Sequence, residues 1–305
     1  MTARDYWQYL FGPEFGGVLL FVIGVLRVRR RLSFSLDGVL PLGAVFVALG
    51  FAVFGAEHFT SAKDLMRMVP AWMPARLFWT YFVGCALIAA ACSLAAGRVV
   101  RWSSALAGLM LLLFVLLIHA PGAMRHPHNR FAWTVAARET LFACGAWALT
   151  GMLTRAPRLV AVCRVTIALV LLFYAVEHFL HPQFLPGVPL EQQTQPWIPL
   201  HSVWGFVEGT ALLVCGGLIL IGRQARAAAT WLAVVTTVLV ILLYVPMFVV
   251  ARKPADVITA INYIADTLLF AGSIMLLADA VPAGRAREAH QPARSGAYSS
   301  RRALG

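Results

Sequence analysis

Apolar residues along the chain fall into nine long runs that short polar segments separate. Eight of the runs approach or exceed the roughly 20 residues that an α-helix needs to cross the hydrocarbon core of a bilayer. Continuous runs of this length favour helices, because in lipid each backbone polar group must find its hydrogen bond within its own segment. The first run is shorter and begins beside Pro13 and Glu14, so it predicts an additional ninth span. The runs cover residues 14–28, 39–60, 77–96, 102–120, 131–152, 159–180, 200–221, 229–250 and 258–280.

Composition supports a membrane location and excludes several classes of protein. Hydrophobic residues make up 60% of the 305 residues and charged residues only 12%, against about 45–50% and about 25% in soluble domains. The formal net charge of +12 comes from short basic groups between the apolar runs, which sets membrane orientation and does not indicate a nucleic-acid partner. We therefore expect an all-α polytopic membrane protein with eight or nine spans, whose main partner is the lipid bilayer.

The distribution of basic residues predicts the orientation. One set of alternate connections carries 16 of the 25 arginines and lysines and the other carries 8, while Arg138 lies within a span. The richer set belongs in the cytoplasm, which places the C-terminus there. Arg27 and Arg29 follow the first run where a signal peptide would have a small-residue cleavage site, so we expect no cleavable signal. Residues 281–305 are polar and basic and predict a disordered cytoplasmic tail.

An internal repeat divides the chain. The two copies, each with four apolar runs, cover residues 39–152 and 153–280, and residues 1–38 form an N-terminal segment with the extra helix and a basic loop. Because four is an even number, both copies have the same orientation, which predicts two tandem parallel four-helix bundles. The matches include Glu57-His58-Phe59 with Glu177-His178-Phe179, Trp72 with Trp197, Trp79 with Trp204, Gly84 with Gly209, Pro121 with Pro246, and Glu139-Thr140-Leu141 with Asp266-Thr267-Leu268.

Acidic residues inside the apolar runs are the candidate functional groups, because ionisable groups in lipid are costly. Glu57 and Glu177 lie at the outer ends of matched runs, each beside a histidine, His58 or His178. Each pair either forms a site that exchanges protons or holds a cation, or bonds to the following Trp-x-Pro loop and fixes its bundle.

Three further acids lie deeper. Glu139 and Asp266 occupy matched positions in the fourth run of each repeat and should face the bundle interior, as a ligand site or as a polar lock between helices. Glu208 corresponds to Val83 in the first repeat. The two bundles therefore differ chemically, and we expect any ligand in the second one.

Histidines and prolines on the outer side suggest two more features. His119, His126 and His128 are weak candidates for a metal site, because their spacing is not that of a standard ligand set; the alternative is an ordinary interfacial position. The loop over residues 181–199 contains five prolines and no basic residue, which predicts a stiff lid over the outer mouth of the second bundle.

A helix that ends in His-Phe, an outer loop with Trp-x-Pro, an aromatic second helix with a glycine and a basic turn recur in both copies. This arrangement resembles the DoxX-like family of small four-helix membrane proteins, here as two fused copies. The resemblance implies a bacterial cytoplasmic membrane.

Three functions are compatible with the resemblance and the acids. The first is a membrane module without chemistry of its own that binds a small or lipophilic molecule near the outer face. The second, which the family name implies, is a quinone-binding subunit of a membrane oxidoreductase, with His58 or His178 at the quinone. The third is proton- or cation-coupled transport through Glu139 and Asp266.

Overall fold

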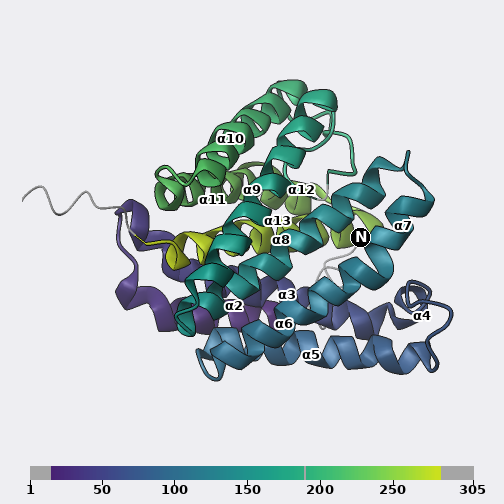
Figure 1. Cartoon of the computed structure of the whole chain (residues 1–305). Helices are drawn as coiled ribbons and strands as arrows, with labels where there is room; N and C mark the ends of the chain where they lie inside the picture. The colour runs from purple at the N-terminus through teal and green to yellow at the C-terminus, as the bar shows by residue number, and fades with distance from the viewer. Residues whose placement is uncertain (1–14, 189, 283–305) are drawn as a thin grey trace, which may run out of the picture.

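The protein is an all-α membrane protein, seen in a computed structural model that describes residues 15–188 and 190–282 (Figure 1). The predicted disorder of residues 281–305 therefore falls almost entirely outside the described residues. Within the described residues, the one strand-like feature is an isolated bridge between Phe184 and Gln193. The fold class expected from the apolar runs is confirmed.

The first half begins with a short helix and continues with four long helical segments. Helix α2 covers Phe15–Val28 and packs on α3 and α5. Pro41 lies in a 3₁₀ turn, Leu36–Leu42, that leads directly into α3. After α3, a short helix α4 lies in the outer loop. The four long segments are α3 (Gly43–Thr60), α5 (Arg76–Ala96), α6 with α7 (Val100–Phe114 and Ala120–Arg125) and α8 (Arg130–Leu153), while α4 covers Ala62–Leu65.

The second half repeats this order. Helices α5 to α7 and the turns before them recur in α10 to α12 at a constant separation of 125 residues, with the same lengths. Ala75 and Val99, which precede α5 and α6, have positive φ angles, and so do their counterparts Leu200 and Gln224. The helices are α9 (Pro157–Leu180), α10 (His201–Ile221), α11 with α12 (Ala225–Leu239 and Val245–Val250) and α13 (Pro254–Ala280).

A short π-helical segment interrupts the third helix of each half. It covers Val115–His119 in the first half and Val240–Tyr244 in the second. A proline follows two residues later in each case, Pro121 or Pro246. Proline lacks an amide hydrogen and its ring clashes with the carbonyl four residues before it, so the helix widens at that point.

Among the residues that the structure describes, seven helical segments are long and apolar enough to cross a membrane, against the eight or nine spans expected. The remaining two expected spans are helical but differ from the seven. The described part of α2 has 14 residues, about 21 Å of helix, which is less than the roughly 30 Å of a hydrocarbon core. Helix α8 has 24 residues but carries Arg130, Arg138 and Glu139 in its first ten positions.

The fourth helices of the two halves lie together at the centre of the molecule. The two four-helix bundles expected from the sequence are therefore not separate from each other. Helix α8 packs on α6, α9 and α13, while α13 packs on α11, α3 and α8 (Figure 1). Each half is therefore completed by the fourth helix of the other. The charged positions of α8 are enclosed by protein on three sides, which lowers the cost of placing them at membrane depth.

Glycines allow α3 and α13 to approach closely. A Cβ atom at Gly272 would lie 2.8 Å from the carbonyl oxygen of Gly43, and one at Gly50 would lie 2.8 Å from the Cβ of Leu269. Small residues at such contacts permit backbone-to-backbone packing of membrane helices. This contact closes one side of the first half.

Candidate functional site

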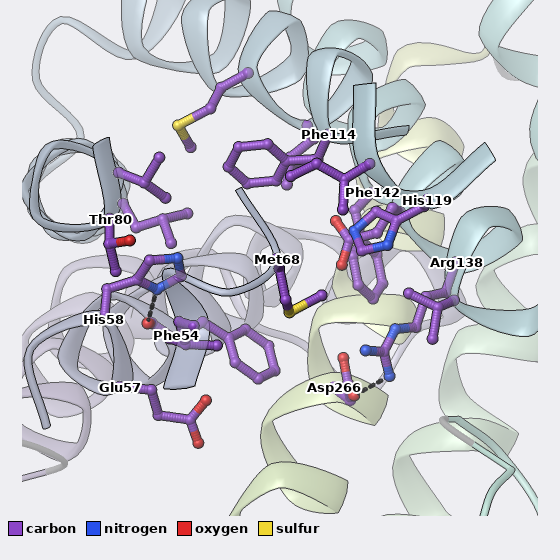
Figure 2. A pocket seen from close by; sticks show the side chains of 18 of the residues that line it. Phe54, Glu57, His58, Met68, Thr80, Phe114, His119, Arg138, Phe142 and Asp266 are labelled. Atoms are coloured by element: carbon purple, nitrogen blue, oxygen red, sulfur yellow. Dashed lines mark hydrogen bonds and ion pairs between the residues drawn. The ribbon is translucent and has the colours of Figure 1, made fainter. Parts of the chain in front are cut away.

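A cavity of about 590 Å³ lies in the first half, between α3, α5, α6, α8 and α13 (Figure 2). This volume is within the range of small-molecule sites. Its walls are mainly aromatic, methionine and aliphatic side chains, which form an apolar chamber. They include Phe51, Phe54, Phe82, Phe114, Phe131, Phe142, Trp79, Met68, Met73 and Met110.

A charged cluster lies on one side of the chamber. Arg138 on α8 and Asp266 on α13 form an ion pair (Figure 2), and Glu139 lines the cavity next to Arg138. Asp266 is only 3% exposed. A buried ion pair is costly to desolvate and needs further hydrogen bonds to compensate.

These further hydrogen bonds are incomplete. Within the described residues, Oδ1 of Asp266, Oδ1 of Asn262 and Nε of Arg138 are buried without a hydrogen-bond partner. Asn262 lies one helical turn before Asp266 on α13, and all three residues line the cavity. Buried polar atoms of proteins are normally hydrogen-bonded, so this side of the chamber can accept a polar group from a ligand.

Histidines occupy both sides of the chamber. His119, the last residue of the π-helical segment in α6, lies beside Arg138 and Phe142, whereas His58 on α3 lies with Thr80 across the cavity (Figure 2). The Nδ1 atom of His58 is 2.7 Å from the carbonyl oxygen of Phe54. This hydrogen bond fixes the orientation of the ring, and Nε2 can then interact with other groups.

In the second half, the loop between α9 and α10 fills the corresponding space. Its residues Leu185, Val188, Leu190 and Ile198 are each at most 1% exposed. This confirms that the loop covers its bundle, and the loop also enters it. We call residues 185–188 and 190, the buried part of this loop, the plug.

Backbone groups of the plug are held by side chains of the second half. Nε2 of His178 accepts a hydrogen bond from the amide of Gly187 at 2.9 Å. The hydroxyl of Tyr244 donates to the carbonyl of Pro186, and that of Thr267 donates to the carbonyl of Val188 at 2.7 Å. The plug thus takes the place that a ligand would need.

Two of these plug-holding residues correspond to cavity residues. His178 matches His58, and Tyr244, at the end of its π-helical segment, matches His119. The loop of the second half is five residues longer than that of the first, because the separation of matched residues rises from 120 to 125 across it. The cavity therefore lies in the first half, whereas the sequence led us to expect any ligand in the second, where the longer loop is buried.

The structure brings together only part of the expected site. Glu57, His58, Glu139, Asp266 and His119 line one cavity. Three of the remaining candidates, Glu177, His178 and Glu208, have other partners and do not line it. Glu177 pairs with Arg130 at 3.4 Å, His178 holds the plug, and Glu208, 1% exposed, accepts a hydrogen bond from Thr236 at 3.0 Å.

Metal ligation finds no support in the described part of the chain. Among those residues no three histidine, cysteine, aspartate or glutamate side chains come together as a metal site. His126 and His128 are exposed in the turn before α8, whereas His119 faces the cavity from the π-helical segment. The three histidines therefore lie in different surroundings.

Sequence reasoning missed several residues that shape the site. Arg138 is the partner of Asp266, and Arg130 donates to the carbonyl of Leu190 at 2.9 Å. The hydroxyl of Tyr263 accepts hydrogen bonds from the amides of Glu191 and Gln192, at 3.1 and 2.7 Å. The signal available for Arg138 was its position within an apolar run, where a basic residue needs an acidic partner.

Comparison with known proteins gives no match: no family model, no curated protein and no solved structure matches this chain.

Proposed function

We propose that this integral membrane protein binds a small, mainly apolar molecule in the cavity of its first half and has no catalytic chemistry of its own. The observation that carries the proposal is the roughly 590 Å³ chamber lined by aromatic and methionine side chains, with a charged cluster on one side. Burial of an apolar ligand in such a chamber stabilises the complex by about 25 cal/mol per Å² of apolar surface. The few polar groups of the chamber set the orientation of the ligand.

The plug supports this reading. In the second half, an apolar peptide segment occupies the equivalent space and is held by a histidine and a tyrosine. The first half retains His58 and His119 at the matched positions, but its loop is five residues shorter and leaves a cavity. Leu65, Met68 and Met73 of this loop line the cavity, with Met68 between the two histidines (Figure 2). The proposal treats the open chamber as the ligand site and the plugged one as its internally filled counterpart.

The positive-inside pattern and the DoxX-like resemblance extend the proposal. They favour a bacterial cytoplasmic membrane with the C-terminus inside, so the cavity, which lies near loops 61–75 and 181–200, would be near the outer face. A partner that supplies or accepts the ligand would then act at that face.

Native mass spectrometry of the detergent-solubilised protein with 2-(2-naphthyl)ethanol, a neutral aromatic probe, tests the proposal. We expect saturable binding of one probe molecule. Val83 is a small, half-buried lining residue, so Val83→Trp should fill the chamber and reduce binding at least tenfold. Val214, exposed on the surface of α10, provides the matched control, Val214→Trp. Equal binding by both variants, or no saturable binding at all, would contradict the proposal.

A quinone-binding subunit is the second candidate, favoured by His58 and Arg138 beside an apolar chamber. The geometry separates the two histidines that could fill this role. Both ring nitrogens of His178 are engaged, by the carbonyl of Tyr174 and the amide of Gly187, whereas His58 lines the cavity. Under this candidate, His58→Ala should lower the quinone that copurifies with the protein and His178→Ala should lower it less; the reverse order would exclude it.

A further inference from the structure

Negatively charged side chains outnumber positive ones around the cavity. Glu57, Glu139, Glu191 and Asp266 line it, and Arg138 is the one arginine or lysine among its lining residues within the described chain. The guanidinium of Arg138 is already committed to Asp266. An excess of carboxylates in a mainly apolar chamber favours a cationic guest.

Among the buried polar atoms of the charged cluster that lack a partner in the described structure, acceptors outnumber donors. Oδ1 of Asp266 and Oδ1 of Asn262, buried and without a partner in the described structure, are both acceptors, and they lie one helical turn apart on α13. The unpartnered Nε of Arg138 is the single donor in this group. A ligand that satisfies the two acceptors must bring N–H or O–H donors, and a charged donor makes the stronger bonds to a carboxylate.

Aromatic rings complete the environment of this cluster. Phe142 lies on the same side of the chamber as His119 and Arg138, and Phe114 lies across the top of the view between the two sides (Figure 2). Aromatic faces attract cations, and the attraction strengthens where water is excluded. Aromatic rings beside carboxylates therefore favour an organic ammonium group that is attached to an apolar moiety.

We infer that the ligand of this cavity is a lipophilic amine, bound as its ammonium ion against Asp266, Asn262 and Glu139 with its apolar part among the phenylalanines. The inference rests on the proposed function and adds the charge of the ligand to it. The ammonium supplies donors to the two open acceptors and compensates Glu139, which the Arg138–Asp266 pair does not neutralise.

Three probes with one naphthalene body and different head groups test the inference: 2-(2-naphthyl)ethylamine, 2-(2-naphthyl)ethanol and 2-naphthylacetate. Dissociation constants for the full-length protein in detergent at pH 7 come from native mass spectrometry. We expect the amine to bind at least tenfold more tightly than the alcohol, and the carboxylate to bind most weakly. Equal or tighter binding of the alcohol overturns the cationic ligand but leaves the proposed function standing. Absence of binding by all three overturns the proposed function itself.

Variants locate the head group. Glu139→Gln and Asn262→Leu should each reduce the preference for amine over alcohol at least threefold, with little change for the alcohol. Glu208→Gln is the matched control, because Glu208 is a buried carboxylate outside this cavity, and it should keep the full preference. If Glu208→Gln lowers the preference as much as Glu139→Gln does, the ammonium does not bind at the cluster. Unfolding temperatures of all three variants show whether a loss of binding reflects loss of the fold.

Discussion

Arg138 on α8 and Asp266 on α13 form an ion pair between the two halves of the protein, across 128 residues of sequence. The pair joins the fourth helices at the centre of the molecule and forms part of the cavity wall. Its position couples the packing of the halves to the chemistry of the site.

Removal of one partner of this pair should destabilise the protein strongly. Asp266→Asn removes the carboxylate that is paired with the buried guanidinium of Arg138, so we expect a loss of up to about 3–5 kcal/mol in the free energy of unfolding. The double change Arg138→Met with Asp266→Leu should cost less, because the two charges of the pair are removed together and neither is left without the other. Unfolding in mixed micelles with increasing dodecyl sulfate measures both. Asp64→Asn is the control, since Asp64 and Arg67 form a pair whose side chains are 77% and 78% exposed, and its effect should be below about 1 kcal/mol.

The plug should loosen when its hydroxyl partner is removed. Tyr244→Phe deletes the hydrogen bond to the carbonyl of Pro186, which should cost about 1 kcal/mol. Hydrogen exchange of the amides of Gly187 and Val188 should then accelerate, while exchange in α5 stays unchanged. Tyr81, 40% exposed, gives the control variant Tyr81→Phe, and faster plug exchange in that variant would contradict the specific role of Tyr244.

The contact between α3 and α13 should not tolerate a side chain at Gly272. Gly272→Val places new atoms against the carbonyl of Gly43, and we expect a loss of about 1–3 kcal/mol from overpacking, with weaker binding in the cavity that α13 lines. A Cβ atom at Gly217 on α10 would meet nothing within 4 Å. Gly217→Val should therefore retain the unfolding temperature of the parent, and a similar loss in both variants would indicate a general effect of valine.

Labelling from one side of the membrane tests the orientation. In a background without the five native cysteines, Lys63→Cys and Arg223→Cys place one thiol at each end of the helices, at exposed positions. A membrane-impermeant maleimide added to intact cells should label residue 63 and label residue 223 only after permeabilisation. The opposite pattern would reverse the orientation expected from the basic residues.

Much of the fold follows from patterns that a sequence contains. Apolar runs predict the helices because lipid requires internal backbone hydrogen bonds. The matched Pro121 and Pro246 mark the places where each third helix widens, although no local pattern predicts the π-helical form itself. The acids Glu139 and Asp266 both line the cavity between the helices, as the cost of charge in lipid predicts.

The sequence could not predict which of the two halves contains the cavity. Glu208 made the second half appear the more polar one, but Glu208 is bonded to Thr236, and the plug enters beside Tyr244 and Thr267. Whether a loop enters a bundle depends on contacts between residues such as Val188 and Thr267 that lie far apart in sequence. The pairing of Arg138 with Asp266 could not be predicted either, because local patterns suggest that each fourth helix packs only within its own half.

The packing of α3 on α13 has a consequence for the order of synthesis. Helix α3 is among the first segments to leave the ribosome, whereas α13 is the last helix of the described chain. At about 5–20 residues per second, the nascent α3 waits about ten to forty seconds for its neighbour, with a glycine-lined face directed toward lipid or a chaperone. The binding chamber therefore acquires its last wall only when translation of the membrane region ends, and a chain truncated before α13 has neither half complete.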